Sequence, residues 1–221
     1  MTHLDIEIKR LKDEILEMFE IISMQLTKTH LAMTTMDKEL AREVNYNEKR
    51  VNALELKIDK DCENIFALFN PVAIDLRFVL AALKINYNLE RIGDIADGIC
   101  RYVSEAKVPF DKELLEATRL DEMFKMAILM IDDVKTSFDN EDTKLARGIF
   151  KKDDLLDEIN GNADMVVEKI ILARPEMIRP SLNIISTMRK LERTGDQIKN
   201  VAEEIIFFIE AKVLKHVSSK Q

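Results

Sequence analysis

The hydrophobic residues of this chain recur every three or four positions over long stretches, which is the period of one face of an α-helix. Between residues 4 and 40 this pattern is almost continuous, with Thr29 filling one gap. The apolar positions of this stretch are Leu4, Ile8, Leu11, Ile15, Met18, Ile22, Leu26, Met33, Met36 and Leu40. An apolar seam of about ten turns is natural in an antiparallel bundle, where each helix packs along its whole length.

Short polar and proline-containing breaks divide the chain into helical segments. Asn70-Pro71 is typical of a helix start, with Asn as the N-cap and Pro at the first helical position. Asp111 is a candidate N-cap for a later helix, and a weaker break lies at residues 45–47. The six predicted helices span residues 3–43, 47–69, 71–106, 112–138, 142–173 and 180–215.

The two halves of the sequence repeat one another. The string Leu-Glu-Arg-x-Gly-Asp occurs at residues 89–94 and again at residues 191–196. A helix interior disfavours Gly, so a shared Gly within such a string indicates a true internal repeat rather than a shared bias of composition. We therefore predict an all-α fold of two tandem homologous three-helix bundles with six long helices, one bundle in residues 1–108 and the other in residues 109–221.

Composition supports a helical fold. The chain of 221 residues contains only five Gly and four Pro, and 33% of its residues are charged. A β-sandwich or barrel needs frequent turns, for which Gly and Pro are the best-suited residues, so an all-β fold is excluded. A hydrophobic fraction of 47% is enough for a large core, which argues against disorder.

Net charge and cysteine content indicate which binding partners and which cellular compartment to expect. The formal net charge of −8 argues against nucleic acid or anionic lipid as the main partner. The longest uncharged stretch, residues 65–74, is about half of what a membrane span needs, and no basic and apolar leader opens the chain. The two cysteines form no Cys-x-x-Cys motif. We therefore expect a reduced cytoplasmic setting without membrane insertion.

Acidic side chains recur at one-turn spacing on the third predicted helix of each half, where residues four apart share one helix face. The preceding helices carry comparable rows of oxygen ligands, and an antiparallel hairpin would bring the rows together. On the third helices the rows contain Glu90, Asp94 and Asp97, and Glu192, Asp196 and Asn200. On the preceding helices they contain Glu48, Asn52, Glu55 and Asp59, and Asp153, Asp157 and Asn160.

Four oxygen ligands converging from two helices would form a cation site. Mn, Fe, Mg and Ca suit such ligands best, and Zn is also compatible. One acidic pair alone would more simply be a solvated face with Arg91 or Arg193 as its counter-charge. Two copies in register favour metal binding. Gly93 and Gly195, in the middle of the acidic pairs, would permit a close approach of a neighbouring helix or ligand, although simple helix packing explains a Gly equally well.

Catalytic constellations are missing from the sequence. The chain has three His, none of which lies three residues after a Glu, as carboxylate-bridged diiron bundles require. It also lacks a Gly-rich phosphate loop and a His-Glu-x-x-His motif. We therefore expect a protein that is not an enzyme, with a metal-dependent hydrolase or oxidase as the disfavoured alternative.

The duplicated Glu-Arg-x-Gly-Asp, at residues 90–94 and 192–196, resembles the PhoU family of phosphate-signalling regulators. The resemblance covers nearly the whole chain. It includes residues 49–55 with Ile58-Asp59, Asp75-Leu76-Arg77, Phe207-Phe208 and His216-Val217.

The resemblance implies two three-helix bundles related by a pseudo-twofold, with multinuclear iron or zinc clusters bound by paired acidic motifs. The first cluster would use Glu48, Asn52, Glu90 and Asp94, helped by Asp97. The second would use Asp153, Asp157, Glu192 and Asp196, helped by Asn200. Two departures from the family pattern weaken these sites: Asn52 stands where an acid is usual, and Lys199 replaces the counterpart of Asp97.

The resemblance also implies a function without catalysis. Such a protein would be a cytoplasmic negative regulator of phosphate uptake and of the phosphate-starvation response. It would act as an adaptor between the ATPase subunit of the phosphate ABC transporter and a sensor histidine kinase, often as a homodimer. The alternative is an accessory protein of a low-affinity phosphate transporter.

Overall fold

The computed structural model describes residues 2–211, and the regular secondary structure of this part of the chain is entirely helical. Seven α-helices and one short 3₁₀-helix occur in this part of the chain, and no strand does. In order they are α1 (His3–Thr35), α2 (Lys38–Phe69), α3 (Ala73–Glu105), α4 (Lys112–Ala117), α5 (Leu120–Asn140), α6 (Thr143–Ala173), η1 (Pro175–Met177) and α7 (Ile178–Glu210). The predicted all-α class is confirmed.

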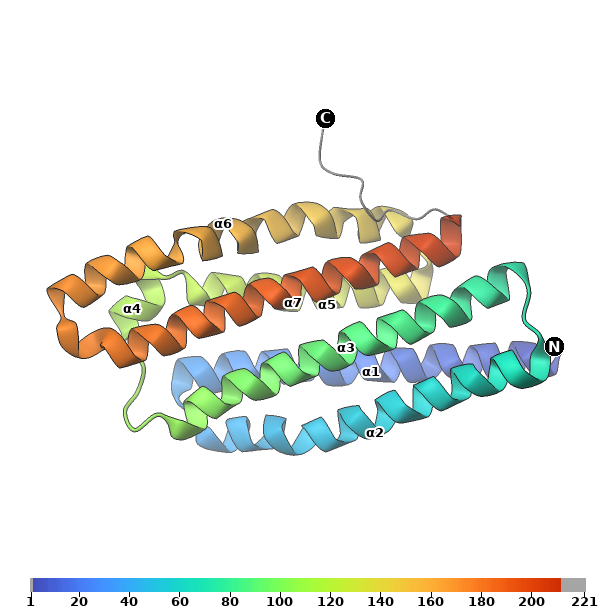
Figure 1. Ribbon diagram of the computed structural model, residues 1–221, viewed down its shortest axis with the longest axis horizontal. Helices are drawn as coiled ribbons and strands as arrows, with labels where there is room; N and C mark the ends of the chain where they lie inside the picture. Colours follow the sequence, from blue (N-terminus) through green and yellow to red (C-terminus); the bar gives the residue numbers. More distant parts are fainter. Residues whose placement is uncertain (1, 212–221) are drawn as a thin grey trace.

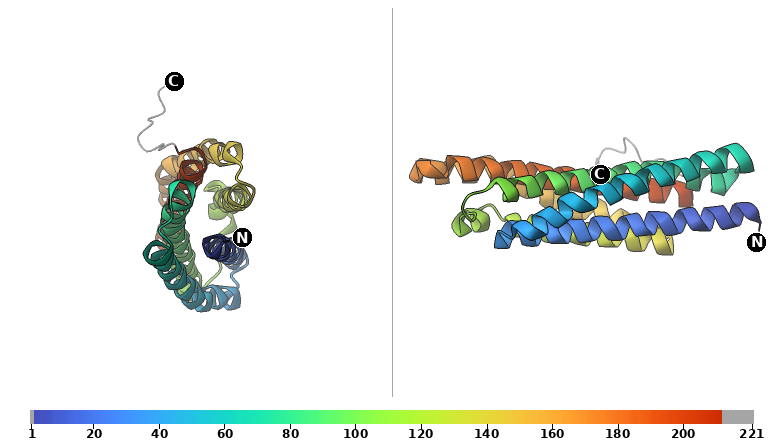
Figure 2. Two further views of the ribbon diagram at one scale, coloured as in Figure 1. Left: turned by 90° about the vertical axis from the view of Figure 1, so that its right-hand side faces the viewer. Right: turned by 90° about the horizontal axis from the view of Figure 1, so that it is seen from below.

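Six of these helices are long and form two three-helix bundles that lie side by side along the same direction (Figure 1). Helices α1, α2 and α3 pack together in the first bundle, and α5, α6 and α7 in the second. The bundles meet where α3 contacts α7 and where α1 contacts α5. Each contact joins helices that hold the same position in the two bundles, as the predicted pseudo-twofold requires, and the end-on view shows the bundles as two stacked units (Figure 2).

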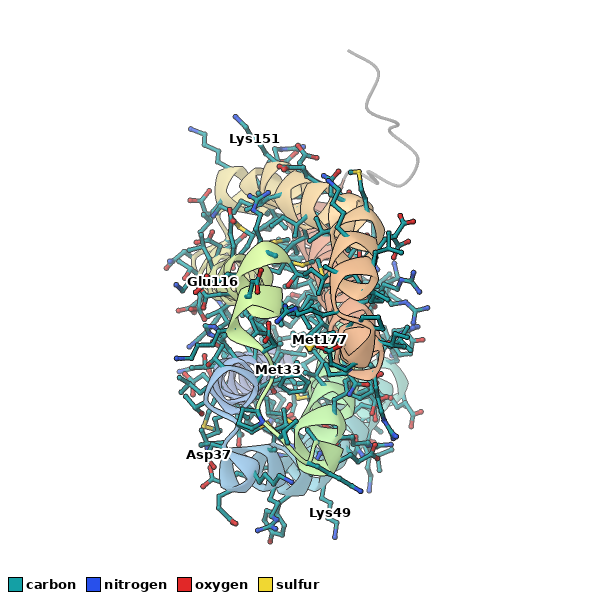
Figure 3. The ribbon with its side chains drawn as sticks, turned by 90° about the vertical axis from the view of Figure 1, so that its left-hand side faces the viewer. Met33, Asp37, Lys49, Glu116, Lys151 and Met177 are labelled. Atoms are coloured by element: carbon teal, nitrogen blue, oxygen red, sulfur yellow. The ribbon has the colours of Figure 1, made fainter. Side chains whose placement is uncertain are left out.

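An aromatic cluster ties the two bundles together at one end of the molecule. Phe138 of α5 lies with its ring centroid 5.7 Å from that of Phe19 of α1 and 6.1 Å from those of Phe78 of α3 and Phe208 of α7. Phe19 and Phe138 are fully buried. Around this core the charged side chains point outward, as Lys49 and Lys151 do at opposite edges in Figure 3.

The break between the first two helices lies earlier than the sequence predicted. Met36 adopts the left-handed conformation with φ of 59°, and Asp37 then accepts hydrogen bonds from the backbone N–H groups of Glu39 and Leu40. This Asp cap starts α2 at Lys38, so the predicted break at residues 45–47 is wrong. Glu48 consequently lies about three turns inside α2 rather than at its start.

Two further helix boundaries differ from the prediction because residues take the left-handed conformation. Asn70, with φ of 46°, is the C-cap of α2 and not an N-cap, and α3 begins only at Ala73. The predicted helix 112–138 is divided into α4 and α5 at Arg119, whose φ is 54°. The last helix begins at Ile178, before Pro180, because the first turn of a helix tolerates a residue without an N–H.

The predicted end of the last helix at residue 215 and the His216-Val217 pair lie outside the described residues. Across residues 2–211, none of the helices combines the length and the apolar character that crossing a bilayer would require.

Candidate functional site

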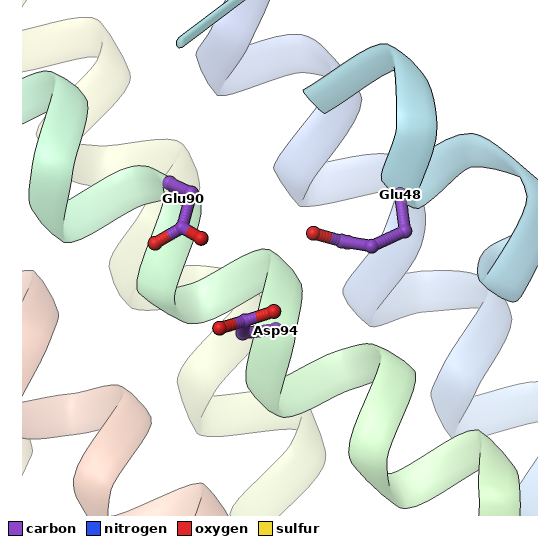
Figure 4. A group of neighbouring side chains, drawn as sticks. All are labelled: Glu48, Glu90 and Asp94. Carbon is purple, nitrogen blue, oxygen red and sulfur yellow. The ribbon is translucent and has the colours of Figure 1, made fainter. Parts of the chain in front are cut away.

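Three carboxylates from two helices of the first bundle converge. Glu48 projects from α2 toward Glu90 and Asp94 of α3, and one oxygen of each lies within 4.8 Å of the others (Figure 4). Among residues 2–211 this is the only group of three or more His, Cys, Asp or Glu side chains that meets so closely. Glu48, Glu90 and Asp94 are all residues that the sequence predicted as ligands.

The absence of a side chain at Gly93 makes room for this convergence. A Cβ added there would lie 3.1 Å from Ile22 Cδ1, and 3.2 Å from both Gln25 Oε1 and Glu48 Oε2. These distances are shorter than ordinary van der Waals contacts, so any larger residue would press on the Glu48 carboxylate. The close approach predicted for Gly93 is therefore present, and it serves both helix packing and the position of Glu48.

Glu48 is the electrostatic centre of the group. Both of its carboxylate oxygens are buried and lack a hydrogen-bond partner. Burial raises the pKa of Glu48 to about 7, and repulsion from Asp94, Asp97 and Glu90 adds to the rise, while the neighbouring Gln25 amide offsets part of it. A buried carboxylate without donors costs free energy unless a proton or a cation neutralises it.

Other side chains around the site share this shortage of positive charge. Burial, followed by repulsion from Asp94 and Glu55, raises the pKa of Glu90. Burial, followed by repulsion from Asp59 and Asp94, raises the pKa of Glu55. Glu55 was placed on this helix face by its spacing but was not chosen as a ligand, and the structure adds it to the electrostatic surroundings of the site.

Gln25 of α1 is a part of the site that the sequence reasoning missed. Its side chain is fully buried, and neither its amide nitrogen nor its oxygen has a hydrogen-bond partner in the structure. The only signal in the sequence is a polar residue beside the apolar seam position Leu26. A buried amide with free polar atoms next to a free carboxylate is a common feature of sites that hold an ion or water.

The remaining residues predicted for the first site, Asp97 and Asn52, are not members of the group of three carboxylates. Asp97 accepts hydrogen bonds from Asn45 Nδ2 at 2.5 Å and from Arg101 Nε at 2.9 Å, so its carboxylate already has a cationic partner. Asn52 is exposed on α2. Metal binding by Asp97 and Asn52 stays a prediction.

The group of three carboxylates fits an oxygen-ligated cation. Two ligand oxygens on opposite sides of an ion with bonds of 2.0–2.6 Å lie about 4–5 Å apart, which is comparable to the separation observed here. A cation bound there would supply the positive charge that both Glu48 oxygens lack. Glu48, Glu90 and Asp94 would hold the ion by their oxygens, and Gln25 could orient Glu48 or a ligating water.

The second predicted site already contains a cation of the protein itself. Lys199 of α7 forms an ion pair with Asp153 of α6, and its Nζ also lies 2.8 Å from Asp196 Oδ1. Burial lowers the pKa of Lys199, but hydrogen bonds to Asp153 and Asp196 outweigh it and leave this pKa raised. The side chain that departs from the family pattern therefore places an ammonium group between two predicted ligands.

Asp153 is the counterpart of Glu48 in the second bundle. It is 2% exposed, and its Oδ1 is buried without a hydrogen-bond partner. Burial raises the pKa of Asp153 to about 6, against the lowering effect of Lys199. A Cβ at Gly195 would overlap Asp153 Oδ1 and lie 2.7 Å from Leu156 Cδ1, so this Gly too permits the approach of a carboxylate.

The other residues predicted for the second site surround this ion pair unequally. Burial, followed by repulsion from Asp196 and Asp157, raises the pKa of Glu192, which places the three carboxylates in one electrostatic environment. Asn200 instead donates a hydrogen bond to Asn88 Oδ1 of α3 at 3.2 Å. Metal binding by this second set stays a prediction, and the geometry makes Lys199 its direct competitor.

Comparison with known protein families agrees with the internal repeat. The sequence pattern of the PhoU domain matches the chain twice, at residues 15–103 and at residues 120–205. The chain is 31% identical over 217 residues to the phosphate-specific transport system accessory protein PhoU homolog 1 of Thermotoga maritima, covering 97% of this chain and 92% of the relative. It is also 31% identical over 214 residues to the accessory protein PhoU of Serratia marcescens, covering 96% and 86% of the two chains.

Solved structures show the same architecture. The crystal structure of PhoU from Pseudomonas aeruginosa superposes with a TM-score of 0.86 at 26% identity, covering 95% of this chain and all of the other. The phosphate transport system regulatory protein PhoU from Streptococcus pneumoniae superposes with a TM-score of 0.83 at 25% identity, covering 96% and 99%. The relatives from Thermotoga maritima, Serratia marcescens and Streptococcus pneumoniae are named as accessory or regulatory proteins and not as enzymes.

Proposed function

Because the chain belongs to the PhoU family, we propose that it is an accessory protein of a phosphate-specific transport system that represses phosphate uptake and starvation signalling when phosphate is plentiful. The observation that carries this proposal is the double match of the PhoU domain in a chain that aligns over nearly its full length with named accessory proteins. The sequence has no His-Glu-x-x-His motif and no His three residues after a Glu, which supports a regulator over a metal-dependent enzyme.

The proposed regulator acts as a cytoplasmic adaptor, in contact with the ATPase subunit of the phosphate ABC transporter and with a sensor histidine kinase, and it assembles as a homodimer. Long helices with exposed faces are suited to binding other proteins, because side chains along one face can contact an elongated partner surface. Apolar side chains such as Leu68, Val72 and Ile74, which are more than half exposed where α2 meets α3, are available for such contacts.

Iron or zinc is the proposed metal, with Mn, Mg and Ca as further candidates, and Glu48, Glu90 and Asp94 form the core of its first site. A bound ion would supply fixed positive charge between α2 and α3 and so lock these helices together. The chain's own contribution is to hold three carboxylates at ligand spacing and to bury the Glu48 oxygens without a cationic partner. The support for this role is the uncompensated Glu48 carboxylate.

Deletion of the gene tests the regulatory role. Expression of phosphate-starvation genes should then stay high in medium with ample phosphate, and the intact gene should restore repression. Normal repression in the deletion strain would overturn the proposal. A requirement for the chain by a low-affinity phosphate transporter, without any effect on starvation genes, would also overturn it in favour of that alternative.

Elemental analysis of the purified protein tests the metal site. The variant Glu48→Gln/Asp94→Asn should lose metal from the first site while keeping its helical content. The matched control Glu63→Gln/Asp154→Asn removes the same two charges from exposed positions on α2 and α6 and should retain the parent's metal content. Full metal content in the Glu48→Gln/Asp94→Asn variant would refute the assignment.

A further inference from the structure

A pocket of about 320 Å³ opens on the seam between the two bundles, where α3 and α7 run next to each other (Figure 1). Its lining includes four cationic side chains and one carboxylate. These charged residues are Arg91 and Arg101 of α3, Lys190 and Arg193 of α7, and Asp94 of α3. Such a gathering of positive charge is unusual on a chain whose formal net charge is −8.

Among residues 2–211, three of these four cations, Arg91, Lys190 and Arg193, form no ion pair with a carboxylate. Arg101 is neutralised by Asp97, which it contacts through Nε at 2.9 Å. Arg91 donates to the neutral hydroxyl of Tyr87 at 2.9 Å. Across residues 2–211, neither Lys190 nor Arg193 has a side-chain hydrogen bond or an ion pair. Lys190 and Arg193 therefore present hydrogen-bond donors that no side chain of the described residues accepts, and they line the pocket.

The Lys190 ammonium group lies close to Gly98 of α3. A Cβ added to Gly98 would be 2.6 Å from Lys190 Nζ, so the ammonium group occupies space that is open because Gly98 has no side chain. Burial and repulsion from Arg101 and Arg193 lower the pKa of Lys190, while Asp94 and Asp97 offset part of this effect. Because these neighbouring cations repel one another, the binding of an anion between them is favoured.

We propose that this α3–α7 pocket binds a phosphoryl oxyanion, either free phosphate or the phosphate group of a larger molecule, through Arg91, Lys190 and Arg193. The planar guanidinium fork matches two oxygens of a phosphate, and an ammonium group adds a compact point charge. The small volume fits a compact anion or a terminal phosphate better than an extended polymer.

Asp94 distinguishes phosphate from other oxyanions. A carboxylate at the pocket edge repels an anion that has only acceptors, such as sulfate. It can accept a hydrogen bond from the protonated oxygen of hydrogen phosphate. Asp94 also belongs to the group of three carboxylates in the first bundle, so the pocket directly adjoins that candidate metal site.

Isothermal titration calorimetry of the purified full-length chain with inorganic phosphate tests the proposal. The variant Lys190→Met/Arg193→Met should bind phosphate at least about tenfold more weakly, because each lost charge-assisted contact contributes on this scale. The matched control Arg50→Met/Lys151→Met removes one Arg and one Lys from exposed positions elsewhere and should bind within about twofold of the parent.

Further arms separate the sources of the anion and the role of metal. Tighter binding of inorganic phosphate than of ATP would support the free ion as the ligand, and the reverse would support a nucleotide phosphate. Equal affinity for sulfate would overturn the assignment to phosphoryl groups. So would phosphate binding that is unchanged in Lys190→Met/Arg193→Met, or that disappears when a chelator removes bound metal.

Thermal unfolding supplies a second readout that is independent of calorimetry. Phosphate should raise the unfolding temperature of the parent and of Arg50→Met/Lys151→Met, but not that of Lys190→Met/Arg193→Met. An equal rise in all three proteins would overturn the proposal. These measurements do not depend on the regulatory role, so failure of this pocket and failure of the proposed function give different results.

Discussion

Gly195 should reverse the effect that a Gly to Ala substitution usually has in a helix. Such a substitution removes freedom from the unfolded chain and normally stabilises a helix by about 1 kcal/mol. At Gly195 the new Cβ would overlap Asp153 Oδ1 and come within 2.7 Å of Leu156 Cδ1. Asp153 cannot move freely, because it is buried and its other oxygen is paired with Lys199.

The size of the effect follows from this ion pair. Loss of one partner of a buried pair costs about 3–5 kcal/mol. The Lys199 side chain is 26% exposed, so water screens part of the loss, and about 2–3 kcal/mol is a more suitable figure. After subtraction of the gain from Ala, Gly195→Ala should lower the free energy of unfolding by about 1–2 kcal/mol. For a chain of this length the unfolding temperature should fall by roughly 3–6 °C.

Thermal unfolding followed by circular dichroism provides the measurement, and the chain offers a matched control. Gly161 lies in α6, and a Cβ added there would meet nothing within 4 Å. Gly161→Ala should therefore raise the unfolding temperature by roughly 2–4 °C. If Gly195→Ala matched or exceeded the stability of the parent while Gly161→Ala behaved as expected, the reasoning about Asp153 would be refuted.

Three further substitutions test other parts of the structure. In metal-free protein the pKa of Glu48 is about 7, raised from 4.5, so the folded state holds a proton that the unfolded state has released. The free energy of unfolding should therefore fall by about 2–3 kcal/mol as the pH rises from 4.5 to 7. Urea unfolding curves measured across that range should show no such fall for Glu48→Gln. The same pH dependence in the parent and in Glu48→Gln would contradict the raised pKa of Glu48. Lys199→Met should destabilise metal-free protein by about 1–3 kcal/mol, because Asp153 is left buried without its cation. Added divalent metal should restore the lost stability in thermal shift assays. If neither the substitution nor the added metal changed stability, Lys199 would not be a competitor for metal at this site. Phe138→Ala should lower the free energy of unfolding, measured with urea, by about 3–5 kcal/mol. The exposed control Leu172→Ala should lower it by less than about 0.5 kcal/mol. Equal losses in the two variants would exclude an aromatic cluster that joins the bundles.

The sequence predicted the architecture because its strongest signals are periodic and repeated. Apolar spacing together with the polar and proline-containing breaks predicted six long helices, although not all of their bounds, and the duplicated Glu-Arg-x-Gly-Asp placed Glu90 and Asp94 on one face of α3. Helix ends were harder to locate, since the residues that end helices in the left-handed conformation are Met36, Asn70, Glu141 and Ala211. Only the Asn is a common residue for that conformation.

The candidate site was predictable only as far as single-helix geometry allowed. Spacing placed Glu48 on a face that could meet Glu90, and the structure brings their oxygens together. Spacing could not show that Lys199 would reach between Asp153 and Asp196, because a long flexible side chain can point in several directions. Nor could it reveal the cationic pocket, whose Lys190 and Arg193 face residues of α3 that lie far away in sequence.

The joint between the two bundles has the form of an isologous interface within a single chain, since α1 meets α5 and α3 meets α7. In a dimer of identical subunits, every substitution at such an interface occurs twice. Here the two copies are fused, and Asp97 of α3 and Lys199 of α7 occupy equivalent places in the repeat with opposite charges. A symmetric dimer could carry two carboxylate sites or two lysine-filled sites, but not one of each. The covalent link between the halves is therefore what permits one molecule to hold two unlike sites.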